Sequence, residues 1–437
     1  MKICLVSHAS VIVECTDLRI WTDPWLFGKA FNNSWTLFPP AVFAQSLLPD
    51  IDYIWISHEH PDHFHVPTLK SLADSFKERV TILFQENNSE KMFEAFKMFG
   101  FQRFRALPHR KIVPLSEATH IYCYHVGQMD STLAIINKGK TLLNVNDAEI
   151  NTSDCRLILK DIRSVDVVLT QFSIAGYCGL KDYQKYLPLL GKRILENISA
   201  NHKDLGAKAT IPFASFIYFS CMDNKYINTF INKPSDVYDY LLQKGQEVAI
   251  LYPGDTYDMN LAYDSASALE RYEVLYATFD SQVSYQSASI IPLPKIAEAF
   301  QIFVQQLHEK YPKIFLRLLE PIRVYIPDLE TKVVFSISTG MFQEAVDTEE
   351  ADLMINSQPF HFCFNYPYGV QTLGVSARFT LLRNFRNWRL HRILFALNNA
   401  EIYLRPKYFF TQRNFNYIKN RWRGALNQFL YQLQRML

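Results

Sequence analysis

The segment Ile51–Leu69, IDYIWISHEHPDHFHVPTL, decides the fold of this chain. Its first half is a short apolar run that is typical of a strand and ends at Ile56, and Pro67 stands where helices begin. Four side chains that can bind a metal lie between these two elements: His58, His60, Asp62 and His63. Because open α/β sheets carry their chemistry on such strand-to-helix loops, the segment predicts a metal site at a sheet edge.

The spacing of these four residues is compatible with two ions. His58 and His60 are two residues apart after an extended segment, so their side chains point the same way and can share one ion. Pro61 stiffens the turn, which lets Asp62 and His63 address a second ion. Two metals about 3.5–4 Å apart can hold a bridging hydroxide and polarise a substrate oxygen. A histidine-rich surface loop is the alternative, but four ligands in this order favour a site for zinc, iron or manganese.

The motif Ser57–His63, SHEHPDH, resembles the ligand motif of the metallo-β-lactamase superfamily. The segments 8–10 and 21–25 are similar to the opening hairpins of that fold. The segments 143–147 and 211–216 resemble the branch that contains the metallo-hydrolase-like part of the CMP-N-acetylneuraminate hydroxylases. The resemblance implies an α/β fold, an αββα metallo-β-lactamase sandwich, over residues 1–290.

The resemblance also implies further metal ligands. It makes Asp147, just past a strand end, a carboxylate that bridges both metals. A third ligand of the first metal is expected before Asp147, and we favour His125 at the end of a short strand, with Asp130 as the alternative. The superfamily's last metal-binding histidine has no counterpart at positions 211–219. The nearest candidates to replace it are Cys221, Ser215 and, further upstream, His202.

A chain of 437 residues is too long for one ordinary core, so two domains are expected. The first, 1–290, is the metal-binding domain. The second, 291–437, is a smaller α+β domain with a basic helical tail; it loosely resembles a sterol-carrier-like domain. Its predicted strands are 322–326, 333–337, 360–364 and 372–379, and its tail carries a helical apolar stripe: Phe415, Ile418, Trp422 and Leu426.

The composition indicates the class of protein and the cellular location to expect. The 20% charged and 49% hydrophobic residues are typical of a globular protein. No apolar run is long enough to span a bilayer, the N-terminus does not have the pattern of a signal peptide, and seven unpatterned cysteines favour a reducing, cytoplasmic location. The part from Arg378 onward holds twelve basic residues and one acid, which fits a membrane surface or a partner. Nucleic acid is not expected, because no recognised binding motif accompanies the charge.

These features predict a metal-dependent hydrolase of a small-molecule substrate. A metal-bound hydroxide would attack the substrate while Asp62 or Asp147 accepts a proton, and the cofactor would be one or two divalent ions, Zn or Fe/Mn. The first alternative is a diiron-type oxygenase that needs an external electron donor as redox partner. The second is a non-catalytic binding or scaffold protein with a decayed site. Candidate substrate contacts are Ser215, Asn224 and Tyr226.

Overall fold

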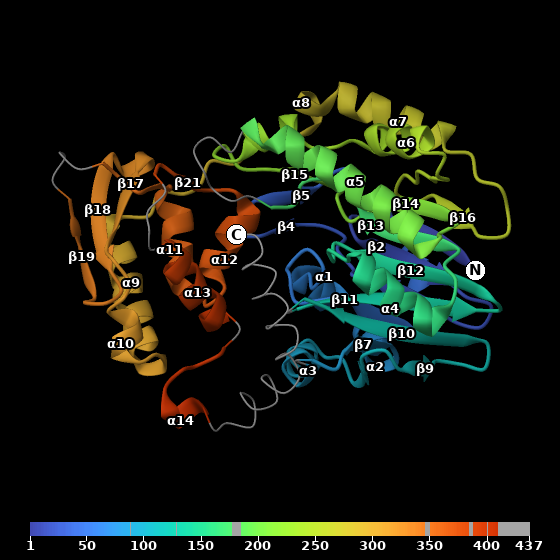
Figure 1. The fold of residues 1–437 in the computed structure, drawn as a ribbon, viewed down its shortest axis with the longest axis horizontal. Coiled ribbons are helices and arrows are strands. Elements are labelled where there is room, and N and C mark those ends of the chain that lie inside the picture. The colour runs from blue at the N-terminus through green and yellow to red at the C-terminus, as the bar shows by residue number, and fades with distance from the viewer. Residues whose placement is uncertain are drawn as a thin grey trace.

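The computed structural model describes residues 1–87, 89–127, 129–176, 185–345, 350–383, 388–399 and 401–409. Figure 1 shows two lobes, with the strands and helices of the N-terminal two thirds on the right and the elements after residue 292 on the left. None of the described helices is both long and apolar enough to cross a membrane.

The first large sheet surrounds the segment that begins at Ile51. It has seven strands in the order β16-β1-β2-β3-β6-β7-β8, and β3, β6, β7 and β8 run parallel. The bounds are Lys2–Ser7 (β1), Ser10–Glu14 (β2), Arg19–Thr22 (β3), Tyr53–Ile56 (β6), Thr81–Gln85 (β7), Arg103–Leu107 (β8) and Thr256–Asp258 (β16). The predicted strand before the histidine motif is therefore a central strand of this sheet.

The second large sheet has six strands in the order β14-β13-β12-β11-β10-β9. The bounds are Ile112–Pro114 (β9), Thr119–Val126 (β10), Asp130–Asn137 (β11), Lys140–Asn146 (β12), Val167–Gln171 (β13) and Ala209–Phe213 (β14). β9 to β12 form an antiparallel meander, and β12, β13 and β14 run parallel.

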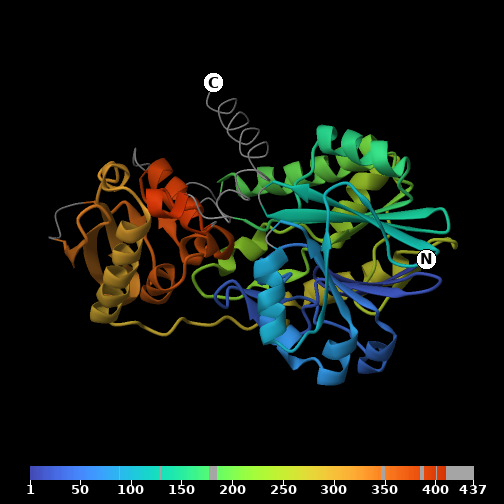
Figure 2. The same cartoon turned by 90° about the horizontal axis from the view of Figure 1, so that it is seen from below.

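The two sheets pack face to face between outer layers of helices. Trp55 and Leu142 belong to the core between the sheets, whereas their neighbours Ile56 and Leu143 belong to the separate outer cores, as the period of two in strands requires. The outer helices are Val66–Ser71 (α1), Asp74–Arg79 (α2) and Ser89–Met98 (α3) on one side, and Thr152–Ile162 (α4) and Leu187–Leu205 (α5) on the other (Figure 2). The predicted αββα sandwich is confirmed.

A smaller three-stranded sheet stands beside the sandwich. It consists of β15, β5 and β4, and its bounds are Lys29–Ala30 (β4), Trp35–Leu37 (β5) and Ile217–Phe219 (β15). Short helical turns cover 45–50 (η1) and 225–229 (η3), and further helices span Pro234–Gln243 (α6), Ala266–Ala277 (α7) and Phe279–Gln282 (α8). An extended segment, 283–292, then leads to the second lobe, as Figure 2 shows. The division at residue 290 stays a prediction.

The second lobe is built around a five-stranded sheet of order β19-β18-β17-β20-β21. Its strands are Ile322–Ile326 (β17), Thr331–Ser336 (β18), Met341–Glu344 (β19), Leu353–Met354 (β20) and Thr380–Leu381 (β21). Its helices are Leu293–Lys310 (α9), Lys313–Leu316 (α10), a short turn at 327–329 (η4), Ser357–Asn365 (α11), Gly369–Ser376 (α12), Trp388–Asn399 (α13) and Pro406–Phe409 (α14). The predicted tail stripe, 415–426, lies outside the described residues.

Two predicted strands of this lobe are wrong. Segment 360–364 lies inside α11, and most of segment 372–379 lies in α12. Phe360, Cys363 and Phe364 are the buried residues that decide the first case, because spacings of three and four place them on one face of a helix. An aromatic-rich run has strand composition, but its burial follows the helical period.

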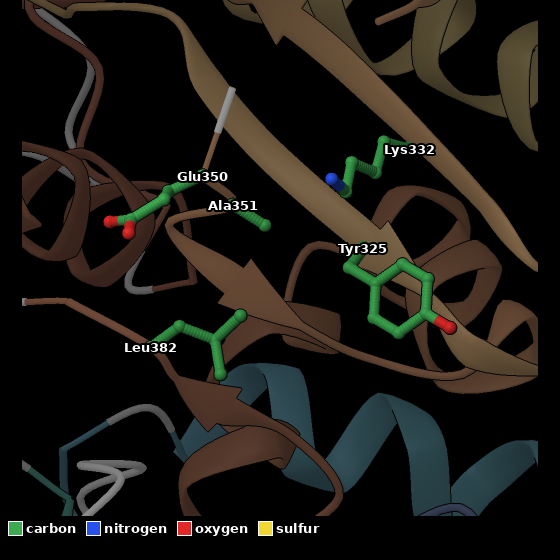
Figure 3. Close-up of a pocket in the computed structure, with 5 residues that line it drawn as sticks. All are labelled: Tyr325, Lys332, Glu350, Ala351 and Leu382. Carbon is green, nitrogen blue, oxygen red and sulfur yellow. The ribbon is translucent and has the colours of Figure 1, made fainter. Parts of the chain in front are cut away.

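A cavity of about 250 Å³ opens on the sheet of the second lobe. Figure 3 shows its lining side chains around β17 and β18: Tyr325, Lys332, Glu350, Ala351 and Leu382. The lining therefore mixes charged and apolar groups.

Candidate metal centre

The histidine motif forms a buried turn directly after β6. The backbone N–H groups of His63 and Phe64 both donate to the carbonyl of His60, which closes the turn. His58, Asp62 and His63 are buried, whereas His60 is only partly so. The sequence thus places its ligand-type side chains at the carboxyl end of a central strand, and the turn points them inward.

Three groups of side chains could each hold an ion, and each group consists of two histidines and one aspartate. In each group the ligand atoms all lie within 4.8 Å of one another. The groups are His8, Asp62 and His63; His58, His60 and Asp130; and His58, His63 and Asp147. They overlap, so together they form one continuous row of ligands.

One end of this row is centred on Asp62. Its Oδ2 lies 3.1 Å from His8 Nε2 and 3.3 Å from His63 Nε2. His63 Nε2 is in turn 3.4 Å from Asp147 Oδ1. Two imidazole nitrogens and two carboxylates therefore converge on one small volume.

The other end is centred on His58. Its Nε2 lies 2.8 Å from His60 Nδ1, 3.7 Å from Asp147 Oδ2 and 4.0 Å from Asp130 Oδ1. Asp147 thus faces His63 with one oxygen and His58 with the other. This is the position that a carboxylate shared by two ions would occupy.

The residues of the row fit a metal, because several of their buried polar atoms lack hydrogen bonds. Within the described part of the chain, His63 Nε2, Asp62 Oδ1 and Asp147 Oδ1 are buried and have no hydrogen-bond partner. Buried polar atoms almost always have one, and neutral imidazole with carboxylate is the donor set of divalent transition metals. These three atoms are therefore available to bind ions.

Asp23 and Ser57 orient two of the imidazoles from behind. Asp23 Oδ2 lies 2.8 Å from His63 Nδ1 and accepts a hydrogen bond from Ser57 Oγ at the same distance. Ser57 Oγ is also 3.0 Å from the Nδ1 atoms of both His58 and His63. Such contacts to the distal nitrogen fix the ring and its tautomer, so Nε2 of each ring is directed to the centre.

The charges of the row are strongly coupled. Burial lowers the pKa of His60 to about 4, helped by neighbouring His58, so its ring is neutral at pH 7. Burial acts to raise the pKa values of Asp62 and Asp147, but His63 outweighs it and both pKa values lie below their usual range. Burial acts to lower the pKa of His63, but the carboxylates raise it well above the ordinary value. A cation at the centre would replace the proton of His63.

Among the described residues, His125 lies outside these three groups. Its Nδ1 is 3.0 Å from Asn87 Nδ2, and its ring is 4.9 Å from that of His109. The hairpin register pairs His125 with Ser131 and Val126 with Asp130, so His125 and Asp130 belong to opposite faces of the strand pair. The alternative residue, Asp130, forms one of the three groups together with His58 and His60.

The side chains of two of the three predicted substrate contacts have backbone partners. Ser215 Oγ accepts hydrogen bonds from the backbone N–H groups of Phe172 and Ser173, both at 3.0 Å. Asn224 Oδ1 accepts from Cys221 N at 2.9 Å, and its Nδ2 donates to Ser376 O at 2.8 Å. The side chains of Ser215 and Asn224 therefore form hydrogen bonds with backbone groups. Tyr226 is partly buried against the core of the second lobe, and as a substrate contact it stays a prediction.

The candidates for the missing last ligand do not join the row either. Cys221 Sγ lies 3.4 Å from Asn33 O, and His202 Nδ1 lies 2.8 Å from Thr210 Oγ1. In the described chain, neither of them is part of a group that could hold a metal. His8 instead completes the set around Asp62 and His63, from the end of β1, far away in sequence.

Sequence reasoning gave no role to His8, Asp23 or Ser57. The sequence offered one signal for His8 and Asp23: each is a polar residue that directly follows a mostly apolar strand. In the structure, both side chains are fully or almost fully buried. Spacing alone could not show that these strand ends meet the motif loop.

Aromatic side chains from the segment 25–35 cover the row. The ring of Phe31 lies 5.9 Å from that of His60, and those of Trp25 and Trp35 lie 5.5 and 6.2 Å from that of His8. Trp25 and Trp35 are fully buried, so this wall limits the access of water to the His8 end.

Comparison with known proteins finds similarity over part of this chain. Residues 2–154 match the family model described as the beta-lactamase superfamily domain. The inactive cytidine monophosphate-N-acetylneuraminic acid hydroxylase of Homo sapiens is 28% identical over 294 residues, covering 59% of this chain and 54% of that protein. The cytidine monophosphate-N-acetylneuraminic acid hydroxylase of Pongo pygmaeus is also 28% identical over 294 residues, covering 59% and 46%. The chain spans about half the length of the curated relatives it matches.

Among solved structures, an isothiocyanate hydrolase from Delia radicum gut bacteria superposes with a TM-score of 0.45 at 15% identity, over 59% of this chain and 99% of that one. CmlA, a diiron β-hydroxylase from Streptomyces venezuelae, gives a TM-score of 0.40 at 16% identity, over 59% and 53%. Likeness at this level assigns no activity. All six predicted ligands fall within the matched segment, residues 2–154, which is similar to the beta-lactamase superfamily domain.

Proposed function

We propose that this protein is a metal-dependent enzyme with two ions along the ligand row. His58, His60 and Asp130 would hold one ion and His8, Asp62 and His63 the other, with Asp147 between them. Two observations support this proposal. Two sets of two histidines and one aspartate are linked by one further carboxylate, that of Asp147. Among the described residues, three buried atoms of the row, His63 Nε2, Asp62 Oδ1 and Asp147 Oδ1, have no hydrogen-bond partner. A decayed, non-catalytic site does not explain why such costly buried groups are kept aligned.

The chemistry that we propose is oxidation of a small-molecule substrate. The observation that carries this choice is Asp130, which supplies a carboxylate where a third histidine was expected. Two histidines and one carboxylate with open positions form the ligand set of non-haem iron oxygenases, and some zinc hydrolases use the same set. The sequence placed hydrolysis first; we place oxidation first, and metal analysis separates the two. This choice agrees with the relatives from Pongo pygmaeus and Sus scrofa, which are cytidine monophosphate-N-acetylneuraminic acid hydroxylases; the relative from Homo sapiens is an inactive one.

When bound, a pair of iron ions would supply the activation of dioxygen. The overall reaction would convert a C–H bond and O₂, with two electrons and two protons, into a C–OH group and water. The two electrons must come from an external donor, so a redox partner is part of the proposal.

The chain's own residues would orient the centre and move protons. Asp23 and Ser57 fix the rings of His58 and His63. His8, 3.1 Å from Asp62 Oδ2, keeps that carboxylate in place, and Asp62 can accept or return a proton there. The buried tryptophans beside His8 exclude water from the reacting volume.

Metal analysis tests this proposal against hydrolysis. Protein purified without added metal should contain iron and show a visible absorption band. Zinc alone, with hydroxide-dependent cleavage of an ester, lactone or phosphodiester, would establish the hydrolase instead.

A variant at position 130 sharpens the test. Asp130→His gives the first ion three imidazoles, so its preference should shift from iron towards zinc, while Asp130→Asn should weaken both metals without such a shift. Glu149→Gln, which removes a nearby acid outside the row, is the matched control. An unchanged iron-to-zinc ratio in Asp130→His would contradict the assignment of Asp130.

A further inference from the structure

Phe31 connects the wall of the metal centre with the second lobe. Its ring lies 5.9 Å from that of His60, in an edge-on arrangement. The residue is 4% exposed and belongs to the same buried hydrophobic cluster as Phe360 and Ala377 of the second lobe. The sandwich therefore supplies His60, whereas the ring beside it packs into the core of the other lobe.

Phe31 begins a turn between β4 and β5 whose backbone is strained. Phe31, Asn32 and Asn33 have successive φ angles of 49°, 56° and 61°. Residues other than glycine rarely adopt such angles, and three in a row persist only when the surrounding contacts hold them. The position of the Phe31 ring therefore depends on the groups to which this turn is bonded.

Two side chains of the second lobe hold the first part of the turn. Asn32 and Gln358 exchange two amide hydrogen bonds of 3.1 and 2.8 Å. Arg378 Nη1 donates to Gln358 Oε1 at 2.8 Å and to the carbonyl of Asn32 at 3.3 Å. We call Gln358 and Arg378 the clamp, because together they bond both the side chain and the backbone of the central residue of the turn.

The clamp is itself fixed. Arg378 is 3% exposed, and its Nε lies 3.0 and 3.1 Å from the two carboxylate oxygens of Asp223. Asp223 Oδ2 also accepts a hydrogen bond of 3.2 Å from Asn356 Nδ2. A buried guanidinium that leaves its carboxylate exposes an uncompensated charge, so the ion pair resists displacement. The clamp is therefore a firm support for a strained turn.

The end of the turn is held by the first lobe instead. Ser220, just after β15, donates from Oγ to the carbonyl of Asn33 at 3.0 Å and from its backbone N–H to the carbonyl of Ser34 at 2.8 Å. These bonds do not involve the clamp. Loss of the clamp should therefore release Phe31 and Asn32 while β4 and β5 stay in place.

We propose that Gln358 and Arg378 are positioning residues of the metal centre: they hold the turn so that the Phe31 ring shields His60. The second lobe is then part of the enclosure of the centre, and a shift of that lobe changes the access of water and solutes to His60. The purpose of the shield rests on the proposed function, in which His60 is a ligand. The contacts involve no ion, so they are tested on metal-free protein.

The reactivity of His60 toward diethyl pyrocarbonate measures the shield. Peptide mass spectrometry gives the modification rate of His60, with His120 on β10 as the internal reference. Gln358→Ala removes both amide hydrogen bonds and leaves the pair of Arg378 with Asp223 intact. It should raise the rate at His60 about tenfold, the factor that corresponds to about 1.4 kcal/mol of lost hydrogen bonding. Arg378→Met should raise the rate at least as much.

Two further variants separate positioning from a general loosening of the fold. Phe31→Ala removes the ring and sets the unshielded rate, and in that background Gln358→Ala should have no further effect on His60. Gln301→Ala removes a glutamine that donates to Gly340 O at 2.8 Å within the second lobe, and it should leave the rate unchanged.

Three results would overturn the proposal: an unchanged rate at His60 in Gln358→Ala, an increase that persists in the Phe31→Ala background, or an equal increase at His120. Metal binding by the wild type is measured separately. A wild type that binds no metal contradicts the proposed function, whereas the rates of the metal-free variants still decide whether the clamp positions Phe31.

Discussion

Asp23→Asn is the change that most directly tests how the metal centre is held. Asp23 is fully buried and accepts three hydrogen bonds of 2.8 Å, from Ser57 N, Ser57 Oγ and His63 Nδ1. The asparagine keeps one oxygen for Ser57 N but places an NH₂ group against the other two donors. Two buried contacts are then lost, each worth about 1–3 kcal/mol, so metal-free protein should lose about 2–6 kcal/mol of unfolding free energy.

The same change should also weaken metal binding. An amide NH₂ next to Nδ1 of His63 favours the tautomer with the proton on Nε2, which then cannot bind an ion. Losing such an orienting partner typically costs 10–100-fold in metal affinity. Urea denaturation of the metal-free protein gives the first quantity, and competition with a chelator gives the second. Asp52→Asn, which also alters a carboxylate bonded to a backbone N–H, is the control and should leave affinity unchanged. Loss of stability with affinity within twofold of the wild type would refute the orienting role of Asp23.

Three further substitutions have defined outcomes. His8→Ala should lower the metal content by one ion per chain in elemental analysis, because Asp62 loses the partner at 3.1 Å and the second ion loses a ligand. Asp130→Ala should reduce metal content while His125→Ala leaves it unchanged; the opposite pattern would restore the sequence-based preference for His125. Phe96→Ala should cost about 3–5 kcal/mol in urea denaturation, since its fully buried ring packs against Phe64 and Phe101, and should leave the ratio of metal to folded protein unaltered.

The sequence predicted the motif loop because its signals are local, whereas the sandwich was implied by the resemblance to the metallo-β-lactamase superfamily. The apolar run before His58 and the close spacing of the ligands depend on neighbours within about ten residues. His8 and Asp23 belong to the same centre, yet their contacts to Asp62 and His63 cross 54 and 40 positions. Only the order of strands brings β1, β3 and β6 into one sheet, with β2 between β1 and β3, and no periodicity encodes that order.

The choice between His125 and Asp130 shows a second limit. Both residues stand near the same hairpin, and imidazole is the better guess by ligand chemistry alone. The register of the hairpin places the two residues on opposite faces of the strand pair, because a shift of one residue exchanges the faces of a strand. Asp130 as a ligand in place of His125 stays a proposal. The helix α11 was missed for a related reason: its aromatic residues have strand composition, and only the burial of Phe360, Cys363 and Phe364 reveals the helical period.

The position of Asp147 has a consequence for how such a centre fills. Its two oxygens face His63 and His58 separately, so one negative charge serves both ends of the row. The first ion to arrive would take up much of that charge and immobilise the side chain. The second would then meet a ready-made but less negative pocket, which makes the two affinities unequal. Stepwise loading of this kind allows one chain to carry two different metals, each at its own end.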